Sequence, residues 1–452
     1  MSTVVSQEVK KSMELLQQVR IIDPTRKTDR LADVLLIDGK IKAIADQITD
    51  YPAQTSIISQ SGLVLATGLV DLYSHSSEPG NEARETLLNL AQAAAAGGFT
   101  QVGILPDTFP SIDNVEVLTA LKQKSELLSS NSQGICLPRL HYWGNSCNAT
   151  KQMNELGELN PEIFGFVYHG DLGSLNVFRQ ILEYVQPWQK AIAIALHQNE
   201  LAGEGVVREG DASIRYGMSG NPGFSEAAMI AAVLEIVAKI PTPVHIMRVS
   251  TKRGVELIAD AKVRGVPITA SATWMHLLWN SDAVGSYDPN FRLEPPLGDN
   301  QDQTALIDGV KQGIIDAIAI DHQAYTYEEK TVPFSLAPPG VIGLELALPL
   351  LWSQFVNSGK WSALELWQAL SSRPRQCMQQ ASVEIAPEQT ADLVLFNPES
   401  TWQVELNNLQ SPAANTPWYN QKIRGKVIKT WHNRNSTVNG NQQLVISQSQ
   451  YC

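Results

Sequence analysis

Strand-like apolar runs alternate with helix-like segments through most of the chain, and this alternation limits the possible folds more than any other feature. Most of the runs are followed by a helical pattern, such as Ser225–Lys239. Such alternation is typical of α/β proteins with a parallel sheet, and eight βα units predict a (β/α)8 TIM-like barrel with insertions. The eight predicted strands are Leu63–Asp71, Thr100–Leu105, Ile135–Tyr142, Phe164–His169, Ala191–His197, Val244–Val249, Ile268–Thr273 and Ala317–Asp321.

The two ends of the chain have a different character, because both contain short strand-like runs without helical partners. Asp38-Gly39 separates two such runs near the N-terminus and predicts a tight hairpin turn. Neither end can form a core alone, so we expect them to pair into one small β-sandwich domain. The predicted domains are residues 1–62 as its N-terminal part, 63–385 as the barrel, and 386–452 as its C-terminal part with a polar tail.

The composition excludes several functional classes. The chain has 452 residues, of which 18% are charged, and 34 basic residues against 46 acidic ones give a net charge of -12. This balance argues against nucleic acid and anionic membrane surfaces as partners. The four cysteines lack C-x-x-C spacing and are expected to be free thiols. With no signal peptide or transmembrane run in the sequence, we expect a cytoplasmic protein.

Polar residues gather where the predicted strands end, which is the active-site face of a TIM-like barrel. They include His75, Asp107, His169, His197, Arg248 and Asp321. Side chains at i and i+2 of a strand point the same way, so a His-x-His pair there would direct two imidazoles at one metal ion. The chain instead has Tyr73-Ser74-His75. A protonated phenol is a poor zinc ligand, which indicates a metal site that has lost a ligand.

The chain resembles the dihydroorotases, cyclic amidohydrolases of the amidohydrolase superfamily, and in particular their non-catalytic dihydroorotase-like members. The resemblance extends from about residue 15 to residue 432. It is carried by the segments Gly68–Asp71, Glu78–Gly80, Leu105–Pro110, Val249–Thr251, Tyr287–Phe291, Pro295–Leu297, Ala317–His322, Glu328–Lys330 and Gly340–Glu345.

The resemblance implies a zinc site whose ligands this chain has largely replaced. The family's His-x-His pair corresponds to Tyr73 and His75, and the histidines after the fifth and sixth strands correspond to Ala195 and Arg248. Asp171 is a candidate for the acidic bridging ligand. Asp321, which the resemblance implies to be a ligand and the general base, is intact, and His75 keeps the second histidine of the pair.

The substrate side is altered as well. The resemblance implies an arginine and two asparagines that hold the substrate carboxylate, and their positions are Ser77, Asp107 and Glu294 here. An anionic substrate would therefore meet like charges and would lose a charge-assisted clamp. Asp107 and Glu294 are each expected to be neutralised by a nearby cation, for which Arg248 is one candidate.

Arg248 argues most strongly against zinc, because a guanidinium offers no lone pair and stays protonated. We expect it to occupy the vacated metal space and to pair with Asp321, which needs another cation there. An alternative is a shifted zinc site built from His75, His197, Asp171 and Asp321, with His169 and His197 otherwise serving as hydrogen-bonding residues. His141, His245 and His432 carry no motif.

Three functions follow from these residues. The first is a non-catalytic protein of pyrimidine biosynthesis that acts as a structural or regulatory partner, with no cofactor; the resemblance implies aspartate carbamoyltransferase as that partner and a homo-oligomer as the assembly. The second is an active zinc dihydroorotase, or related cyclic amidohydrolase, with a remodelled site. The third is a protein that binds a cationic or neutral small molecule through the altered pocket.

Overall fold

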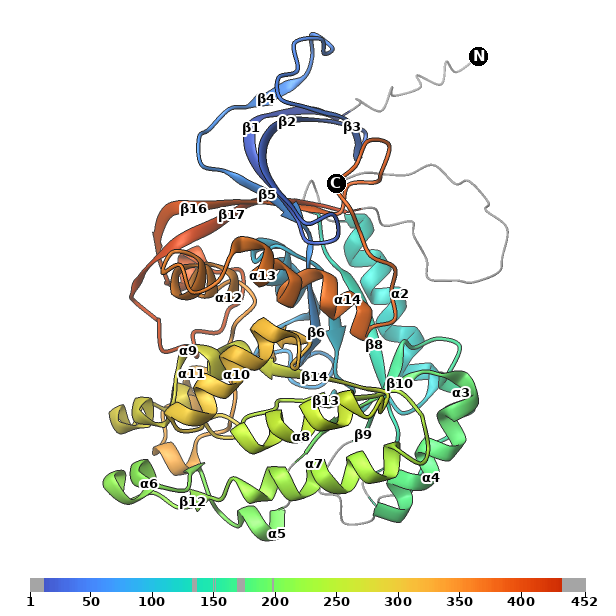
Figure 1. Cartoon of the computed structure of the whole chain (residues 1–452), viewed down its shortest axis with the longest axis vertical. Helices are drawn as coiled ribbons and strands as arrows, with labels where there is room; N and C mark the ends of the chain where they lie inside the picture. Colours follow the sequence, from blue (N-terminus) through green and yellow to red (C-terminus); the bar gives the residue numbers. More distant parts are fainter. Residues whose placement is uncertain are drawn as a thin grey trace.

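A computed structural model of the chain describes residues 12–131, 136–148, 150, 152–168, 175–196 and 199–432. Within them, eight parallel strands form a nearly closed barrel in the order β15-β14-β13-β10-β9-β8-β7-β6 (Figure 1). The predicted α/β barrel is therefore confirmed. Its strands are β6 Leu69–Ser74, β7 Phe99–Ile104, β8 Arg139–Asn145, β9 Gly165–Tyr168, β10 Ala191–Ala195, β13 Val244–Met247, β14 Ile268–Thr273 and β15 Ala317–Ala319.

Helices cover the outside of this barrel (Figure 1). The predicted helix after the fifth strand is present as α7, although α5, α6 and the small β11–β12 pair precede it. The helices are α1 Leu87–Ala96, α2 Val115–Asn131, α3 Leu156–Leu159, α4 Leu175–Val185, α5 Asn199–Ala202, α6 Asp211–Tyr216, α7 Phe224–Val237, α8 Lys252–Val263, α9 Trp274–Leu278, α10 Asn300–Gln312, α11 Tyr327–Lys330, α12 Ala347–Leu351, α13 Ala363–Trp367 and α14 Arg373–Cys377. The short strands β11 and β12 span Val207–Arg208 and Gly220–Asn221.

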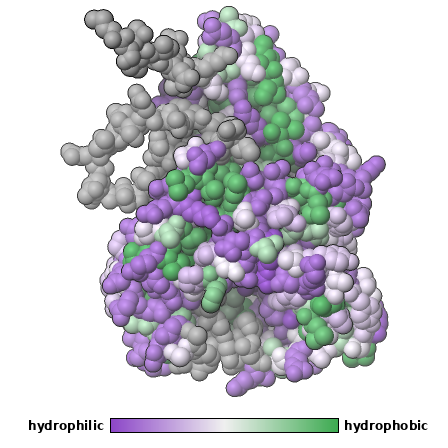
Figure 2. Space-filling view, turned by 180° about the vertical axis from the view of Figure 1, so that it is seen from behind, coloured by the Kyte–Doolittle hydropathy of each residue, from purple (hydrophilic) through white to green (hydrophobic). Residues whose placement is uncertain are grey.

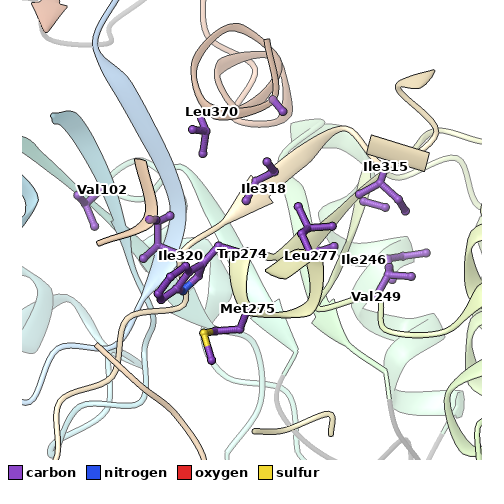
Figure 3. Packing of buried hydrophobic residues seen from close by; sticks show 14 of the residues in the cluster. Val102, Ile246, Val249, Trp274, Met275, Leu277, Ile315, Ile318, Ile320 and Leu370 are labelled. Atoms are coloured by element: carbon purple, nitrogen blue, oxygen red, sulfur yellow. The ribbon is translucent and has the colours of Figure 1, made fainter. Parts of the chain in front are cut away.

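Two hydrophobic layers result from the alternation of side chains along the barrel strands. Outward residues such as Ile246 and Ile318 pack against the helices, as Figure 3 shows around Trp274 and Leu277 of α9. Inward residues such as Ala193 form a separate inner cluster. The barrel interior is thus filled with side chains and is not an open channel.

The terminal segments pair with each other, as the sequence predicted, and their strands form one seven-stranded sheet. The N-terminal segment supplies β1 to β5, and β16 of the C-terminal segment pairs antiparallel with β5. Asp38 and Gly39 have φ values of 49° and 68°, which suit the predicted hairpin turn. The strands are β1 Met13–Asp23, β2 Thr28–Ile37, β3 Lys40–Ala45, β4 Ser56–Ile58, β5 Val64–Thr67, β16 Leu393–Gln403 and β17 Lys422–Trp431.

Two strand predictions were wrong in their limits by more than two residues. The run Leu63–Asp71 is not one strand, because β5 lies in the terminal sheet and β6 in the barrel, with Gly68 between them. The third barrel strand begins at Arg139 and not at Ile135, which lies outside the described residues. The apolar composition of a run does not predict where such a strand begins or ends, because these limits depend on which neighbouring strand the backbone pairs with.

The face turned away from the viewer in Figure 1 is mostly hydrophilic, with separate hydrophobic patches (Figure 2). A long hydrophobic patch lies in its upper part, where the terminal sheet is. None of the helices in the described part of the chain combines the length and the apolar character needed to span a bilayer.

Candidate functional site

An ion pair between Arg248 and Asp321 occupies the mouth of the barrel. Arg248 Nε donates to Asp321 Oδ2 at 2.8 Å, and Nη2 donates to Oδ1 at 2.6 Å. Both side chains are only 17% exposed. The expected pairing is therefore present, and its two-pronged geometry is the strong form of an arginine–carboxylate contact. Burial alone would raise the pKa of Asp321, but Arg248 and His75 hold it well below its usual range.

Tyr73 supports Arg248 from inside the barrel. The Arg248 backbone N–H donates to the Tyr73 hydroxyl at 3.1 Å, and the guanidinium carbon lies 5.7 Å from the centre of the phenol ring. The hydroxyl also bonds Ser271 Oγ at 2.9 Å, and Ser271 bonds His245 Nε2 at 2.9 Å. Tyr73 is fully buried, which raises the pKa of its phenol. The phenol is therefore a neutral, packed group.

The backbone around the ion pair has an unusual conformation. Arg248 and Asp321 have φ values of 55° and 54°, in the left-handed region that side chains other than glycine rarely adopt. Such residues cost about 1–3 kcal/mol each and persist only where their surroundings hold them. After Arg248, the buried carboxylate of Glu226 accepts the backbone N–H groups of Ser250 and Thr251 at 3.0–3.2 Å. This contact fixes the turn that directs Arg248 inward.

His75 lies between two carboxylates. Its Nδ1 contacts Asp107 Oδ2, and its Nε2 lies 3.3 Å from Asp321 Oδ1. Burial lowers the pKa of His75, but Asp107 and Asp321 outweigh that effect and raise the pKa to about 9. The ring is therefore a cation at neutral pH.

One contact of His75 favours the opposite charge state. Arg248 Nη2 lies 3.0 Å from His75 Nε2, and a guanidinium can only donate, so a neutral ring would accept a hydrogen bond there. The two carboxylates decide for the cation, because Asp107 and Asp321 lie on either side of the ring and both raise the pKa of His75.

Glu294 and Asp107 have partners other than Arg248. Glu294 Oε2 lies 3.3 Å and 3.4 Å from the terminal nitrogens of Arg292, and Asp107 contacts His75. The expectation that each acid lies near a cation is met. Arg248, the candidate cation for these two acids, instead donates its carboxylate hydrogen bonds to Asp321.

The other predicted site residues are more scattered. Ala195 ends β10 and packs against the inner cluster of the barrel. Ser77 lies in the turn after β6, where its carbonyl accepts the Asn81 N–H at 2.7 Å. His169, Asp171 and His197 lie outside the described residues.

A cavity of about 220 Å³ opens beside the ion pair. His75, Arg248, Glu294 and Asp321 line it, so the structure brings these four predicted residues together. Apolar side chains form much of the remaining wall, among them Met275, Leu293, Ile320 and Val341.

Sequence reasoning missed three residues that shape this site. Arg292 neutralises Glu294, and His245 with Ser271 supports Tyr73. A signal for His245 existed, because it shares the inward side of β13 with Met247, two residues away. Ser271 and Arg292 carry no comparable mark, since their partners come from distant parts of the chain or from a loop.

The donors that the structure describes do not fit a divalent cation. A structural or catalytic zinc site needs three or four ligands with lone pairs. Arg248 has none, both oxygens of Asp321 accept from it, and Tyr73 is a protonated phenol. Within the described ranges, no group of three His, Cys, Asp or Glu side chains could hold a metal ion.

Solved structures of hydantoinases share the fold of this chain. An L-hydantoinase (dihydropyrimidinase) from Arthrobacter aurescens matches with a TM-score of 0.77 and 19% identity, over 96% of this chain and 98% of its own. A D-hydantoinase from Thermus sp. matches with a TM-score of 0.74 and 21% identity, over 92% and 93%. The barrel and the terminal sheet of this chain therefore have the fold of these hydantoinases.

Sequence relatives identify the family. A family model described as Dihydro-orotase-like matches residues 62–132. A "Probable dihydroorotase-like protein" from Synechocystis sp. is 40% identical over 91% of this chain and 98% of its own length. A "Dihydroorotase" from Syntrophus aciditrophicus is 32% identical over 92% and 97%. The chain belongs to the dihydroorotase-like family.

Proposed function

We propose that this chain is a non-catalytic member of its family that binds no zinc. The observation that carries the proposal is the pairing of both Asp321 oxygens with Arg248, at 2.6 and 2.8 Å. In a zinc hydrolase the metal polarises the scissile carbonyl and activates water, and it requires ligands with lone pairs and an open position. Here a permanent cation lies against Asp321, a ligand that the resemblance leaves intact.

The neighbouring groups support the same proposal. A base at Asp321 would need to take up a proton, yet Arg248 and His75 hold its pKa well below the usual range. Glu294 and Asp107 stand where the resemblance implies asparagines that bind a carboxylate. An anionic substrate would therefore meet acids where neutral donors are required.

Elemental analysis of the purified protein, with dihydroorotate hydrolysis assayed in parallel, tests the absence of zinc chemistry. We expect far less than one zinc per chain and no turnover, including after incubation with added zinc. The "Dihydroorotase" of Syntrophus aciditrophicus is a suitable positive control. Near-stoichiometric zinc with turnover would show that the chain is an active cyclic amidohydrolase and would overturn the proposal.

We further propose that the chain acts as a structural or regulatory partner of aspartate carbamoyltransferase in pyrimidine biosynthesis and that it self-associates. The support is the family resemblance, together with an intact barrel framework around an altered site. Sedimentation of the purified chain, alone and mixed with aspartate carbamoyltransferase from the same source, tests both statements. We expect a faster boundary that contains both proteins, whereas independent sedimentation at micromolar concentrations would contradict the partnership.

A further inference from the structure

We propose that the cavity beside Arg248 binds a small zwitterionic α-amino acid with an apolar side chain. The proposal rests on the proposed function in one respect, because Arg248 must remain in place and no metal may displace it. It goes further by naming a ligand class for the altered pocket.

The first support is a set of polar groups that face the cavity without being used by the fold. Arg248 engages Asp321 through Nε and Nη2 only, and its Nη1 makes no hydrogen bond to another described residue. The side-chain amide of Gln323 also lines the cavity without a hydrogen bond inside the described ranges. A few convergent polar groups in a mainly apolar cleft are the usual signature of a ligand site.

Glu294 supplies an acidic group on the wall of the same cavity. Its side chain is 31% exposed, and Oε2 contacts Arg292 at 3.3 and 3.4 Å, whereas Oε1 makes no hydrogen bond to the described residues. A ligand with an acceptor for Arg248 Nη1 and a cationic donor for Glu294 would engage both groups. A carboxylate and an ammonium group on one small molecule meet these requirements.

The charge balance favours a ligand without net charge. Among the residues that line the cavity, Arg248 and His75 are cationic, and Asp321 and Glu294 are anionic. Adding a lone anion or a lone cation to a balanced, partly desolvated set would leave an uncompensated charge. A zwitterion leaves the balance unchanged while offering an opposite charge to Arg248 and to Glu294.

Size and wall chemistry narrow the class. The cavity of about 220 Å³ is smaller than the pockets of roughly 300–1,000 Å³ that hold drug-sized ligands. Met275, Leu293 and Val341 offer an apolar surface for a short aliphatic side chain. L-Valine is therefore the probe that we would use first.

Isothermal titration of the full chain with L-valine tests the proposal. For so small a ligand we expect a Kd on the order of 0.1–1 mM. N-acetyl-L-valine lacks the ammonium charge and L-valinamide lacks the carboxylate, so each is expected to bind at least about tenfold more weakly. Failure of L-valine to bind at ~10 mM, or equal binding of either blocked form, would overturn the proposal.

Variants place the binding in this cavity. Glu294→Gln is expected to weaken L-valine binding about tenfold, whereas Glu399→Gln, an exposed glutamate of β16 paired with Arg424, should leave binding unchanged. Because the blocked ligands are tested on the unaltered chain, the proposal stays falsifiable if Glu294→Gln fails to fold. Near-stoichiometric zinc in the same samples would overturn the proposed function. Metal-free protein that does not bind L-valine would overturn this inference alone.

Discussion

The Arg248–Asp321 pair shows how strongly a single residue depends on its partner. Arg248→Met would leave Asp321 in a largely buried place with His75 as its remaining cation. Removal of one partner from a buried ion pair costs about 3–5 kcal/mol. Because both side chains keep 17% exposure, we expect a loss of about 2–4 kcal/mol in the free energy of unfolding. Urea unfolding at neutral pH measures it.

A double variant separates the lost charge pair from lost packing. Arg248→Met combined with Asp321→Leu removes both charges, so the uncompensated carboxylate disappears. We expect the double variant to recover most of the stability that the single variant loses. Equal losses in the two variants would indicate that packing of the Arg248 side chain, and not its charge, stabilises the barrel mouth.

His75 gives a pH dependence of defined sign. Its pKa in the folded chain is about 9, above the value of about 6.5 expected in the unfolded chain. The stabilisation that it provides is therefore fully present below pH ~6.5 and is lost as the pH rises toward 9. Relative to His75→Gln, the unaltered chain should lose on the order of 2–3 kcal/mol of stability over this range.

Imidazole resonances give a direct check of this assignment. In a pH titration by NMR, the His75 ring should remain cationic at pH 8, and Asp107→Asn should lower its pKa. His245 is a matched reference, because burial and Lys262 lower its pKa to about 3 and keep the ring neutral. A His75 midpoint near 6.5 would instead favour the neutral ring that accepts from Arg248.

Prediction of single contacts from the sequence succeeded where charge allowed only one pairing. Asp321 had lost its cation and Arg248 had entered a ligand position, so their pairing followed from charge alone. The contact between His75 and Asp107 did not follow, because it depends on how two loops approach each other. The left-handed backbone at Arg248 and Asp321 could not be predicted from the sequence either, because neither residue type favours that conformation.

At the level of elements, the junction at Gly68 explains why the first predicted strand was wrong. β5 and β6 are both buried apolar segments, so the run Leu63–Asp71 looks continuous. Gly68 lies where the terminal sheet meets the barrel, and its N–H donates to Asp392 O at 2.9 Å. Only the close approach of other chain segments reveals the change of sheet, and that information is not local.

This close approach makes Gly68 sensitive to any side chain. A Cβ at this position would lie 2.3 Å from Thr100 Oγ1 and 2.4 Å from Asp392 Oδ1. Overpacking of this kind costs about 1–3 kcal/mol, so Gly68→Ala should lower the free energy of unfolding by that amount and shift the urea midpoint to a lower concentration. Gly157→Ala is a matched control, because its Cβ would meet only Tyr184 Oη at 3.5 Å. Equal midpoints for the two variants would contradict a tight junction.

At the level of the whole molecule, the barrel and the terminal sheet are tied together by buried polar contacts. Arg375, which lies in α14, donates to both carboxylate oxygens of Asp392 at 3.0 Å and to Gly68 O at 3.3 Å. Asp392 also accepts from Thr100 Oγ1 at 2.6 Å. These contacts join the start of β16 to the first two barrel strands, so we expect the two parts to unfold in one transition.

The C-terminal strands complete a core that the N-terminal segment cannot close. Leu393, Leu395 and Trp431 pack with Leu16, Val34 and Leu65 in one buried cluster. A chain that ends at residue 385 would lose β16 and β17 and would leave the β5 edge unpaired, a template for aggregation. We expect little soluble protein from it, whereas a control that ends at His432 keeps both strands and should stay soluble.

Co-expression of residues 386–452 should restore solubility to the shortened chain, because β16 pairs with β5 through a separate stretch of sequence. A monomeric, soluble chain of residues 1–385 with an unchanged urea midpoint would mean that the barrel folds without β16 and β17.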